Sequence, residues 1–170
     1  MTILVTYGSE RGGTAGLANM VADGLRAEGF VVTVSPASLA EAPDAYEAVV
    51  VGGAVYAMRW HADSRRYVRR HATALRRCPT YLFSSGPLDD SATKKEIPPV
   101  KGVVHLMEVT GARRHATFGG RLLPESRGLI AHQMAKKLSG DWRDTNQVRE
   151  WTAKIAADLR AGGQEQQKAG

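Results

Sequence analysis

A glycine-rich loop near the N-terminus has the composition of an anion-binding site. It consists of Ser9, Glu10, Arg11, Gly12, Gly13 and Thr14, between a short apolar run and a stretch with helical periodicity. The first backbone N–H groups of a helix have no intrahelical partner, so they attract a negative charge. The glycines let the backbone close around an anion, and the Ser9 and Thr14 hydroxyls add donors. The loop predicts a phosphate site; an ordinary βα turn with Thr14 as N-cap is the alternative.

Two later apolar runs also end in small or polar residues. Residues 49–51 lead into Gly52-Gly53, and residues 81–83 lead into Ser84-Ser85-Gly86-Pro87. In an open parallel sheet, ligands bind beyond the carboxyl ends of the strands. We therefore expect these two segments and the phosphate loop to form one composite site.

An alternation of strand and helix patterns positions these loops. Strands are predicted at residues 3–5, 30–34, 49–51, 81–83 and 116–118, with the runs apolar enough to be buried on both faces. Helical spacing follows Thr14, covers 62–77, begins again at Pro98-Pro99, and returns before the C-terminus with Trp151 on its apolar face. This order predicts an α/β fold, with a doubly wound parallel sheet between two helical layers.

The size and composition indicate one domain. The chain has 170 residues, of which 43% are hydrophobic, and we expect a domain over residues 1–161 with a disordered polar tail at 162–170. A single cysteine, Cys78, excludes an internal disulfide framework. The N-terminal apolar run is too short for a signal peptide or a membrane span, so a cytoplasmic location is expected.

The charge bears on the partners of the protein. A net charge of +6 and a pI near 9.7 favour an anionic small-molecule substrate or an acidic redox partner. Nucleic acid is not expected, because only 6% of residues are aromatic and no zinc-finger spacing is present. Membrane-surface contact through residues 121–139 is a further option, but that stretch lacks the aromatic side chains typical of interfacial helices. A helix packed on the domain is favoured there.

Three downstream stretches place the phosphate loop in a family. They are VVVGGAVY at residues 49–56, HATAL at 71–75 and GDWRD at 140–144. Together with the S-x-x-G-x-T pattern of the first loop, they resemble the flavodoxin-like family that includes menaquinone-dependent protoporphyrinogen oxidase, over nearly the whole chain. The resemblance implies a flavodoxin-like five-stranded sheet of order 2-1-3-4-5, FMN as the cofactor and a redox function. A deazaflavin, which also carries a phosphate and a tricyclic ring, is the alternative cofactor.

The resemblance also assigns the site residues. The phosphate falls to Ser9, Glu10, Arg11, Gly12, Gly13 and Thr14. The loop on one side of the flavin ring consists of Ala54, Val55, Tyr56, Ala57 and Met58. The loop on the other side consists of Ser84, Ser85, Gly86, Pro87 and Leu88. The second ring loop contains no aromatic residue, so Tyr56 or Trp60 can stack on one side of the ring only.

Three functions agree with this sequence. The first is an FMN-dependent oxidoreductase that oxidises a porphyrinogen or a similar reduced anionic substrate and passes electrons to a quinone. The second is a one-electron carrier between proteins, although ordinary flavodoxins are acidic and this chain is basic. The third is a binding module that has lost FMN. Among the histidines, only His61 lies next to a ring loop, and a surface or helix-cap role is favoured for it.

Overall fold

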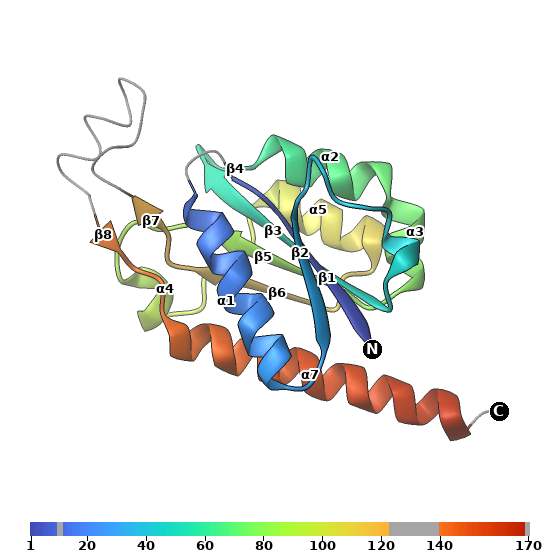
Figure 1. Cartoon of the computed structure of the whole chain (residues 1–170). Coiled ribbons are helices and arrows are strands. Elements are labelled where there is room, and N and C mark those ends of the chain that lie inside the picture. The colour runs from blue at the N-terminus through green and yellow to red at the C-terminus, as the bar shows by residue number, and fades with distance from the viewer. Residues whose placement is uncertain (10–11, 123–139, 169–170) are drawn as a thin grey trace.

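The computed structural model describes residues 1–9, 12–122 and 140–168 and has three layers (Figure 1). The central layer contains the parallel strands β1 (Thr2–Gly8), β2 (Val31–Pro36), β3 (Ala48–Tyr56), β5 (Thr80–Ser85) and β6 (Arg114–Phe118). Their order is β2-β1-β3-β5-β6, with the short β4 (Arg59–Trp60) antiparallel to β3. Counted among the parallel strands alone, this is the predicted order 2-1-3-4-5, and the flavodoxin-like α/β prediction is confirmed.

Helices α1 (Gly13–Ala27) and α7 (Thr145–Lys168) cover one face of the sheet. Leu17 and Val21 of α1 and Ile155 of α7 are fully buried against Ile3 and Val5 of β1. The Trp151 indole of α7 packs edge-on against the rings of Phe83 and Phe118. Trp151 therefore anchors the final helix on the sheet, as its position in the apolar stripe predicts.

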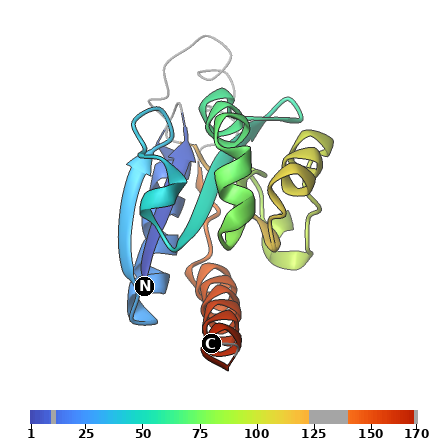
Figure 2. The same ribbon diagram turned by 90° about the vertical axis from the view of Figure 1, so that its right-hand side faces the viewer.

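Helices α2 (Ala62–Arg70), α3 (Ala72–Arg77) and α5 (Lys101–Thr110) cover the opposite face (Figure 2). Val68, Leu75 and Leu106 pack there against Leu4 and Val49. The sequence predicts one helix over 62–77, whereas the structure divides it at His71. The backbone of His71 leaves the helical region, at φ −110° and ψ 16°, and the chain changes direction there.

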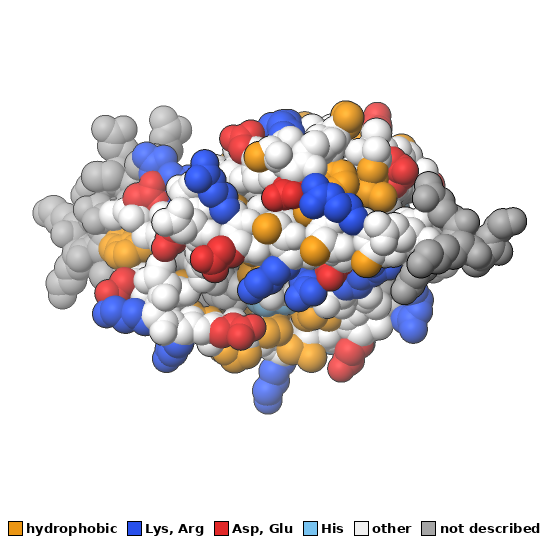
Figure 3. Space-filling view, turned by 90° about the horizontal axis from the view of Figure 1, so that it is seen from below, with side chains coloured by type: hydrophobic (Ala, Val, Ile, Leu, Met, Phe, Trp, Pro, Cys, Tyr) orange, Lys and Arg blue, Asp and Glu red, His pale blue; other side chains and the backbone are white. Residues whose placement is uncertain are grey.

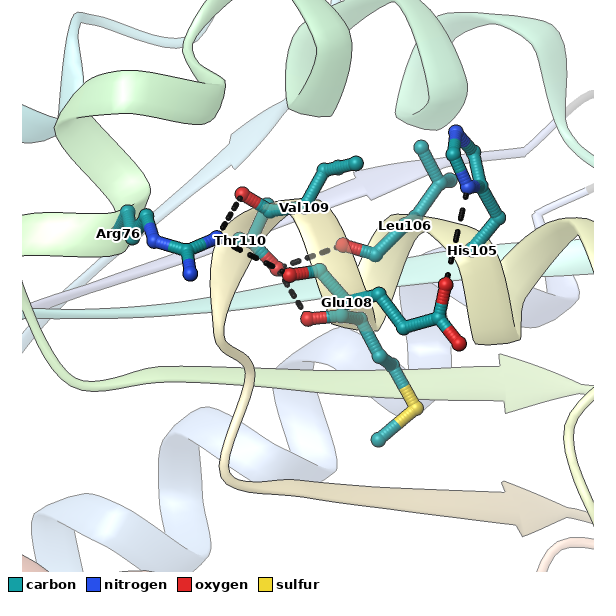
Figure 4. Close-up of polar contacts among 7 residues, drawn as sticks. Arg76, His105, Leu106, Glu108, Val109 and Thr110 are labelled. Carbon is teal, nitrogen blue, oxygen red and sulfur yellow. Dashed lines mark hydrogen bonds and ion pairs between the residues drawn. The ribbon is translucent and has the colours of Figure 1, made fainter.

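Arg76 of α3 ties this layer together at the end of α5 (Figure 4). Its Nη1 donates to the carbonyl oxygens of Glu108 and Val109, each at 3.2 Å. These carbonyls belong to the last turn of α5, where a helix has unpaired acceptors and a partial negative charge. Gly111, at φ 65°, ends the helix immediately afterwards. Arg76 therefore has structural partners at the end of α5.

Short elements connect these layers. They are the 3-10 helix η1 (Pro43–Ala45), α4 (Ser91–Lys94), and the antiparallel pair β7 (Arg121–Leu122) and β8 (Gly140–Asp141). The C-terminal helix also differs from the prediction of a disordered tail at 162–170, because α7 continues to Lys168. Its last two turns contain Gln, Glu and Lys. These are good helix formers, and they offset the low helix propensity of Gly162 and Gly163.

Candidate functional site

The carboxyl ends of the strands bring the three predicted segments together. Gly8 lies beside Gly53, Gly53 beside Ser84, and Ser84 beside Thr117, on four neighbouring strands. The start of α1, the β3–β4 hairpin and the end of β5 therefore share one edge of the sheet (Figure 1). This is the edge at which the sequence predicts a composite site.

The phosphate loop leads directly into α1. Gly12 is the N-cap residue in the left-handed conformation, at φ 75°, and its N–H donates to the Ser9 hydroxyl oxygen at 3.1 Å. Thr14 is not the N-cap; it is the second residue of the helix, and its side chain is buried. The first turn of α1 contains no acidic residue, so nothing there repels an anion. Glu10 and Arg11 lie outside the described residues.

The first ring segment is a β-hairpin and not the loop that the sequence suggested. Ala54, Val55 and Tyr56 form the last part of β3, and only Ala57 and Met58 make the turn into β4. Tyr56 pairs with Arg59, and both turn residues have positive φ, 48° and 60°. This is the geometry of a type I′ turn, which normally requires Asn and Gly. Because neither is present, no local signal in the sequence predicts the hairpin.

The hairpin exposes large apolar side chains to solvent at the carboxyl ends of the strands. We call this edge of the sheet, where the composite site is predicted, the ligand edge. Tyr56 is 54% exposed and Met58 is 75% exposed. Trp60, the other aromatic residue suggested for stacking, is buried under β3 with 2% exposure. Of the two candidates, Tyr56 is therefore the one whose ring is accessible to a ligand.

The glycines of β3 have a packing role. A Cβ on Gly52 would overlap the ring of Phe83, and one on Gly53 would lie 2.5 Å from the Trp60 indole on the other face. From the sequence alone, this pair of glycines indicates a ligand loop. The structure instead places both glycines within the strand, where large aromatic rings approach the backbone from each side.

The start of α2 packs closely against Gly8, the last residue of β1. A Cβ on Gly8 would lie 2.5 Å from the His61 Nδ1 atom, so only glycine allows this approach. The Ser64 hydroxyl donates to the Gly52 carbonyl at 2.7 Å, and the Asp63 N–H donates to His61 Nδ1 at 3.2 Å. His61 is therefore the N-cap of α2, in agreement with the cap role favoured for it.

The second ring segment contains a contact that sequence reasoning missed. Ser84 and Ser85 are the last residues of β5, and Gly86, Pro87 and Leu88 follow the strand. The Ser84 hydroxyl lies 2.9 Å from His115 Nε2 on the neighbouring strand β6. Burial lowers the pKa of His115 to about 4, so its imidazole is neutral near pH 7. The Ser84 side chain is thus engaged with His115.

The backbone after β5 is fixed by the end of β6. The Gly86 N–H donates to the Phe118 carbonyl at 3.0 Å, and the Gly120 N–H donates to the Pro87 carbonyl at 2.9 Å. These bonds hold residues 86–88 next to the carboxyl edge. The second ring segment therefore offers a fixed backbone to a ligand, with Leu88 as its only large apolar side chain.

The GDWRD segment connects this edge to α7. The Trp142 N–H donates to the Gly120 carbonyl at 3.0 Å, and the Asp144 carboxylate accepts from the Asn146 N–H at 2.8 Å. Asp144 thereby satisfies an unpaired N–H at the start of α7, as an N-cap residue does. The backbone of Trp142 thus fixes the entry to that helix.

The comparisons with known proteins agree with this architecture. A family model described as "Flavodoxin domain" matches residues 4–147. The chain belongs to the flavodoxin domain family. Its cofactor is accordingly FMN, and the function that it shares with the family is electron transfer. No curated protein matches the chain.

Solved structures of other proteins share the fold of this flavodoxin domain. Flavodoxin 1 from Bacillus cereus has a TM-score of 0.61 and 14% identity over 92% of this chain and 98% of that chain. The Streptococcus pneumoniae TIGR4 flavodoxin has a TM-score of 0.59 and 18% identity over 93% and 99%. Rubredoxin oxygen:oxidoreductase from Desulfovibrio gigas has a TM-score of 0.63 and 14% identity over 94% of this chain. The chain spans only 36% of that oxidoreductase.

The residues of the ligand edge fit FMN. The left-handed Gly12, the Ser9 hydroxyl and the start of the 15-residue helix α1 suit a phosphate group. The hairpin and residues 84–88 lie on adjacent strands, so both segments border the place where the resemblance puts the flavin ring. Among the described residues, no helix is long and apolar enough to cross a membrane, and no three His, Cys, Asp or Glu side chains gather as metal ligands.

Proposed function

We propose that this flavodoxin domain is an FMN-dependent oxidoreductase that oxidises a reduced anionic substrate of the porphyrinogen class and passes the electrons to a quinone-like acceptor. The observation that carries the proposal is the juxtaposition of the ring segments with arginine side chains. Arg59 lies on the hairpin itself and is exposed, and Arg65 of α2 donates from Nε to the Trp60 carbonyl of the same hairpin at 2.9 Å. A carboxylate-bearing substrate at the ring edge would meet positive charge there.

Each segment of the edge has a defined task in this proposal. Ser9, Gly12 and Gly13 hold the phosphate through hydroxyl and backbone donors. Tyr56 covers one side of the ring, and the backbone of Gly86 and Pro87 borders the other. FMN supplies the redox chemistry when bound, so the protein needs no nucleophile of its own. The chain binds and orients the cofactor, and the arginines orient the substrate.

The second candidate is a one-electron carrier between proteins. It is favoured by the exposure of Tyr56 and Met58, because an apolar hairpin tip beside the ring suits docking of another redox protein. Electron transfer is also the function shared by the family. Carrier and oxidase differ in their reductant, which is a protein for the carrier and a small molecule for the oxidase.

The two candidates are separated by an anaerobic turnover experiment. The FMN-loaded protein is mixed with protoporphyrinogen and a soluble quinone, and porphyrin fluorescence is recorded. The oxidase predicts a rate proportional to protein concentration. Porphyrin formation no faster than in a protein-free control, together with rapid flavin reduction by a reductase protein, would support the carrier. A protein that binds no FMN at all would leave the binding-module alternative.

The role of the arginines has its own matched test. The double variant Arg59→Gln/Arg65→Gln removes two charges beside the β3–β4 hairpin. Arg77→Gln/Lys154→Gln removes two exposed charges elsewhere, on α3 near the start of β5 and on α7. We expect the first variant to raise KM for the porphyrinogen about tenfold with little change in FMN affinity, as expected for loss of charge-assisted contacts. Equal KM values for the two variants would contradict substrate recognition by Arg59 and Arg65.

A further inference from the structure

Two arginines outside the phosphate loop stand against the first turn of α1. We propose that Arg121 and Arg143, held together by Asp141, form a cationic wall of the phosphate subsite, and that this wall makes the protein select phosphorylated over unphosphorylated flavin. The inference uses FMN as the family cofactor and does not depend on which molecule reduces it.

Close packing against glycines places both residues. A Cβ on Gly13 would lie 2.9 Å from the Arg121 carbonyl oxygen, and a Cβ on Gly16 would overlap the Arg143 guanidinium group. Gly13 begins α1 and Gly16 lies three residues later, roughly 5 Å along the helix axis. The strand β7 and the Arg143 side chain therefore lie directly on the first turn of α1, whose N–H groups would hold the phosphate.

Asp141 fixes the guanidinium group in this place. Arg143 donates to both Asp141 oxygens, with Nε to Oδ1 at 2.7 Å and Nη2 to Oδ2 at 2.5 Å. The Arg121 Nε lies 3.7 Å from Asp141 Oδ2. Hydrogen bonding to Arg143 lowers the pKa of the Asp141 carboxyl, so the carboxylate stays charged. Two guanidinium groups and one carboxylate leave one net positive charge beside the loop.

The remaining nitrogen of Arg143 is directed at α1. Nη1 is the atom nearest to the Cβ position of Gly16, and it has no hydrogen-bond acceptor among the described residues. The side chain is only 14% exposed, so water screens its charge less than it would on an open surface. The first turn of α1 carries no acidic side chain that would cancel it.

The surrounding backbone makes the wall rigid. Arg121 pairs with Asp141 across the β7–β8 ladder, the Trp142 N–H is bonded to Gly120, and Asp144 caps α7. The GDWRD segment thus holds Arg143 against α1, immediately before the start of α7. A purely structural tie between these helices is the competing explanation, and it makes no distinction between FMN and riboflavin.

The experiment measures dissociation constants of the apoprotein for FMN and for riboflavin by fluorescence quenching, at low and high salt. Arg143→Gln should weaken FMN binding about tenfold, as expected for loss of one charge-assisted contact, and should leave riboflavin binding unchanged. The salt dependence of FMN binding should become shallower, and Arg143→Lys should restore part of the affinity. Arg77→Gln, on the opposite helical layer, is the matched control.

Two results would overturn the proposal. An equal loss of affinity for FMN and riboflavin would indicate a structural tie only, and unchanged FMN affinity would show that the charge is not sensed. Circular dichroism checks that each variant is folded. If Arg143→Gln does not fold, Arg121→Gln, at a side chain with 41% exposure, provides the same FMN-to-riboflavin comparison.

Discussion

At the scale of single residues, Gly12 sets the shape of the phosphate loop. Its φ of 75° is a conformation that side-chain-bearing residues rarely adopt, although no atom lies within 4 Å of its Cβ position. Gly29, at φ 90° and the far end of α1, has the same open surroundings. The two glycines therefore differ in their distance from the ligand and hardly in backbone strain.

This pair gives a prediction with an internal control. Gly12→Ala and Gly29→Ala should each lower the free energy of unfolding by about 1 kcal/mol, because Ala is strained at positive φ. Only Gly12→Ala should weaken FMN binding, since it alone distorts the loop. Chemical denaturation and FMN fluorescence titration measure the two quantities. Equal FMN affinities for the two variants would contradict the phosphate assignment.

His115 makes the stability of the protein depend on pH. Its folded pKa of about 4 lies below the usual value of 6.5, so below pH 6.5 the unfolded chain takes up a proton that the folded protein does not. The contribution of neutral His115 is complete above pH 6.5 and is lost as the pH falls towards 4. At most about 3 kcal/mol is involved, from the size of the pKa difference.

The matching variant is His115→Gln, which keeps a polar side chain beside Ser84 and cannot titrate. We expect its free energy of unfolding to vary less than that of the wild type between pH 6.5 and pH 4. Denaturation curves at a series of pH values test this. Parallel pH profiles for the two proteins would show that His115 is not the group responsible.

How much of the site could be predicted differs from residue to residue. The glycine turn that opens α1 at Gly12 follows from local sequence, because helix starts and glycine turns are defined by neighbouring residues. The Ser84–His115 contact could not be predicted, because it joins residues 31 positions apart on adjacent strands. Arg143 on Gly16 was hidden for the same reason, since only the packing of β7 and α7 brings them together.

At the scale of elements, the β3–β4 hairpin is the largest departure from the sequence prediction. Strand propensity correctly located residues 49–51, but the strand continues to Tyr56. The tight turn then uses Ala57 and Met58 at positive φ, where sequence reasoning looks for Asn and Gly. Strained turn residues beside a ligand edge are the kind of feature that local rules miss.

The strain predicts the sign of two identical substitutions. Ala57→Gly should raise the free energy of unfolding by about 1 kcal/mol, because it relieves the positive φ of 48°. Ala153→Gly, at an exposed interior position of α7, should lower it by about 1 kcal/mol through lost helix propensity. Thermal or chemical denaturation measures both. Destabilisation by Ala57→Gly equal to that by Ala153→Gly would contradict the strained turn.

At the scale of the whole molecule, charge distinguishes this chain from acidic flavodoxins. The formal net charge is +6, and on the face seen from below, Lys and Arg side chains are interspersed with Asp and Glu (Figure 3). The excess positive charge is therefore not gathered into one block on that face.

The strand order and the layers could be predicted from the alternation of patterns, because burial on both faces leaves a continuous apolar signal in each strand.

The net charge predicts the redox behaviour of the bound flavin. A positive environment stabilises the anionic reduced form, so we expect a less negative reduction potential than that of an acidic flavodoxin. An electrochemical titration of both proteins in the same buffer measures the difference, which should shrink as salt is added. A potential as low as that of the acidic protein would show that the net charge is not sensed at the ring.

The central claim is that one edge of the sheet, built from three segments, binds FMN. Hydrogen exchange of the backbone amides, measured with and without FMN, tests it most directly. We predict that FMN slows exchange in the phosphate loop, in the β3–β4 hairpin and in residues 84–88 together, while the amides of α5 stay unchanged. Protection confined to another surface, or absent from all three segments at saturating FMN, would contradict it.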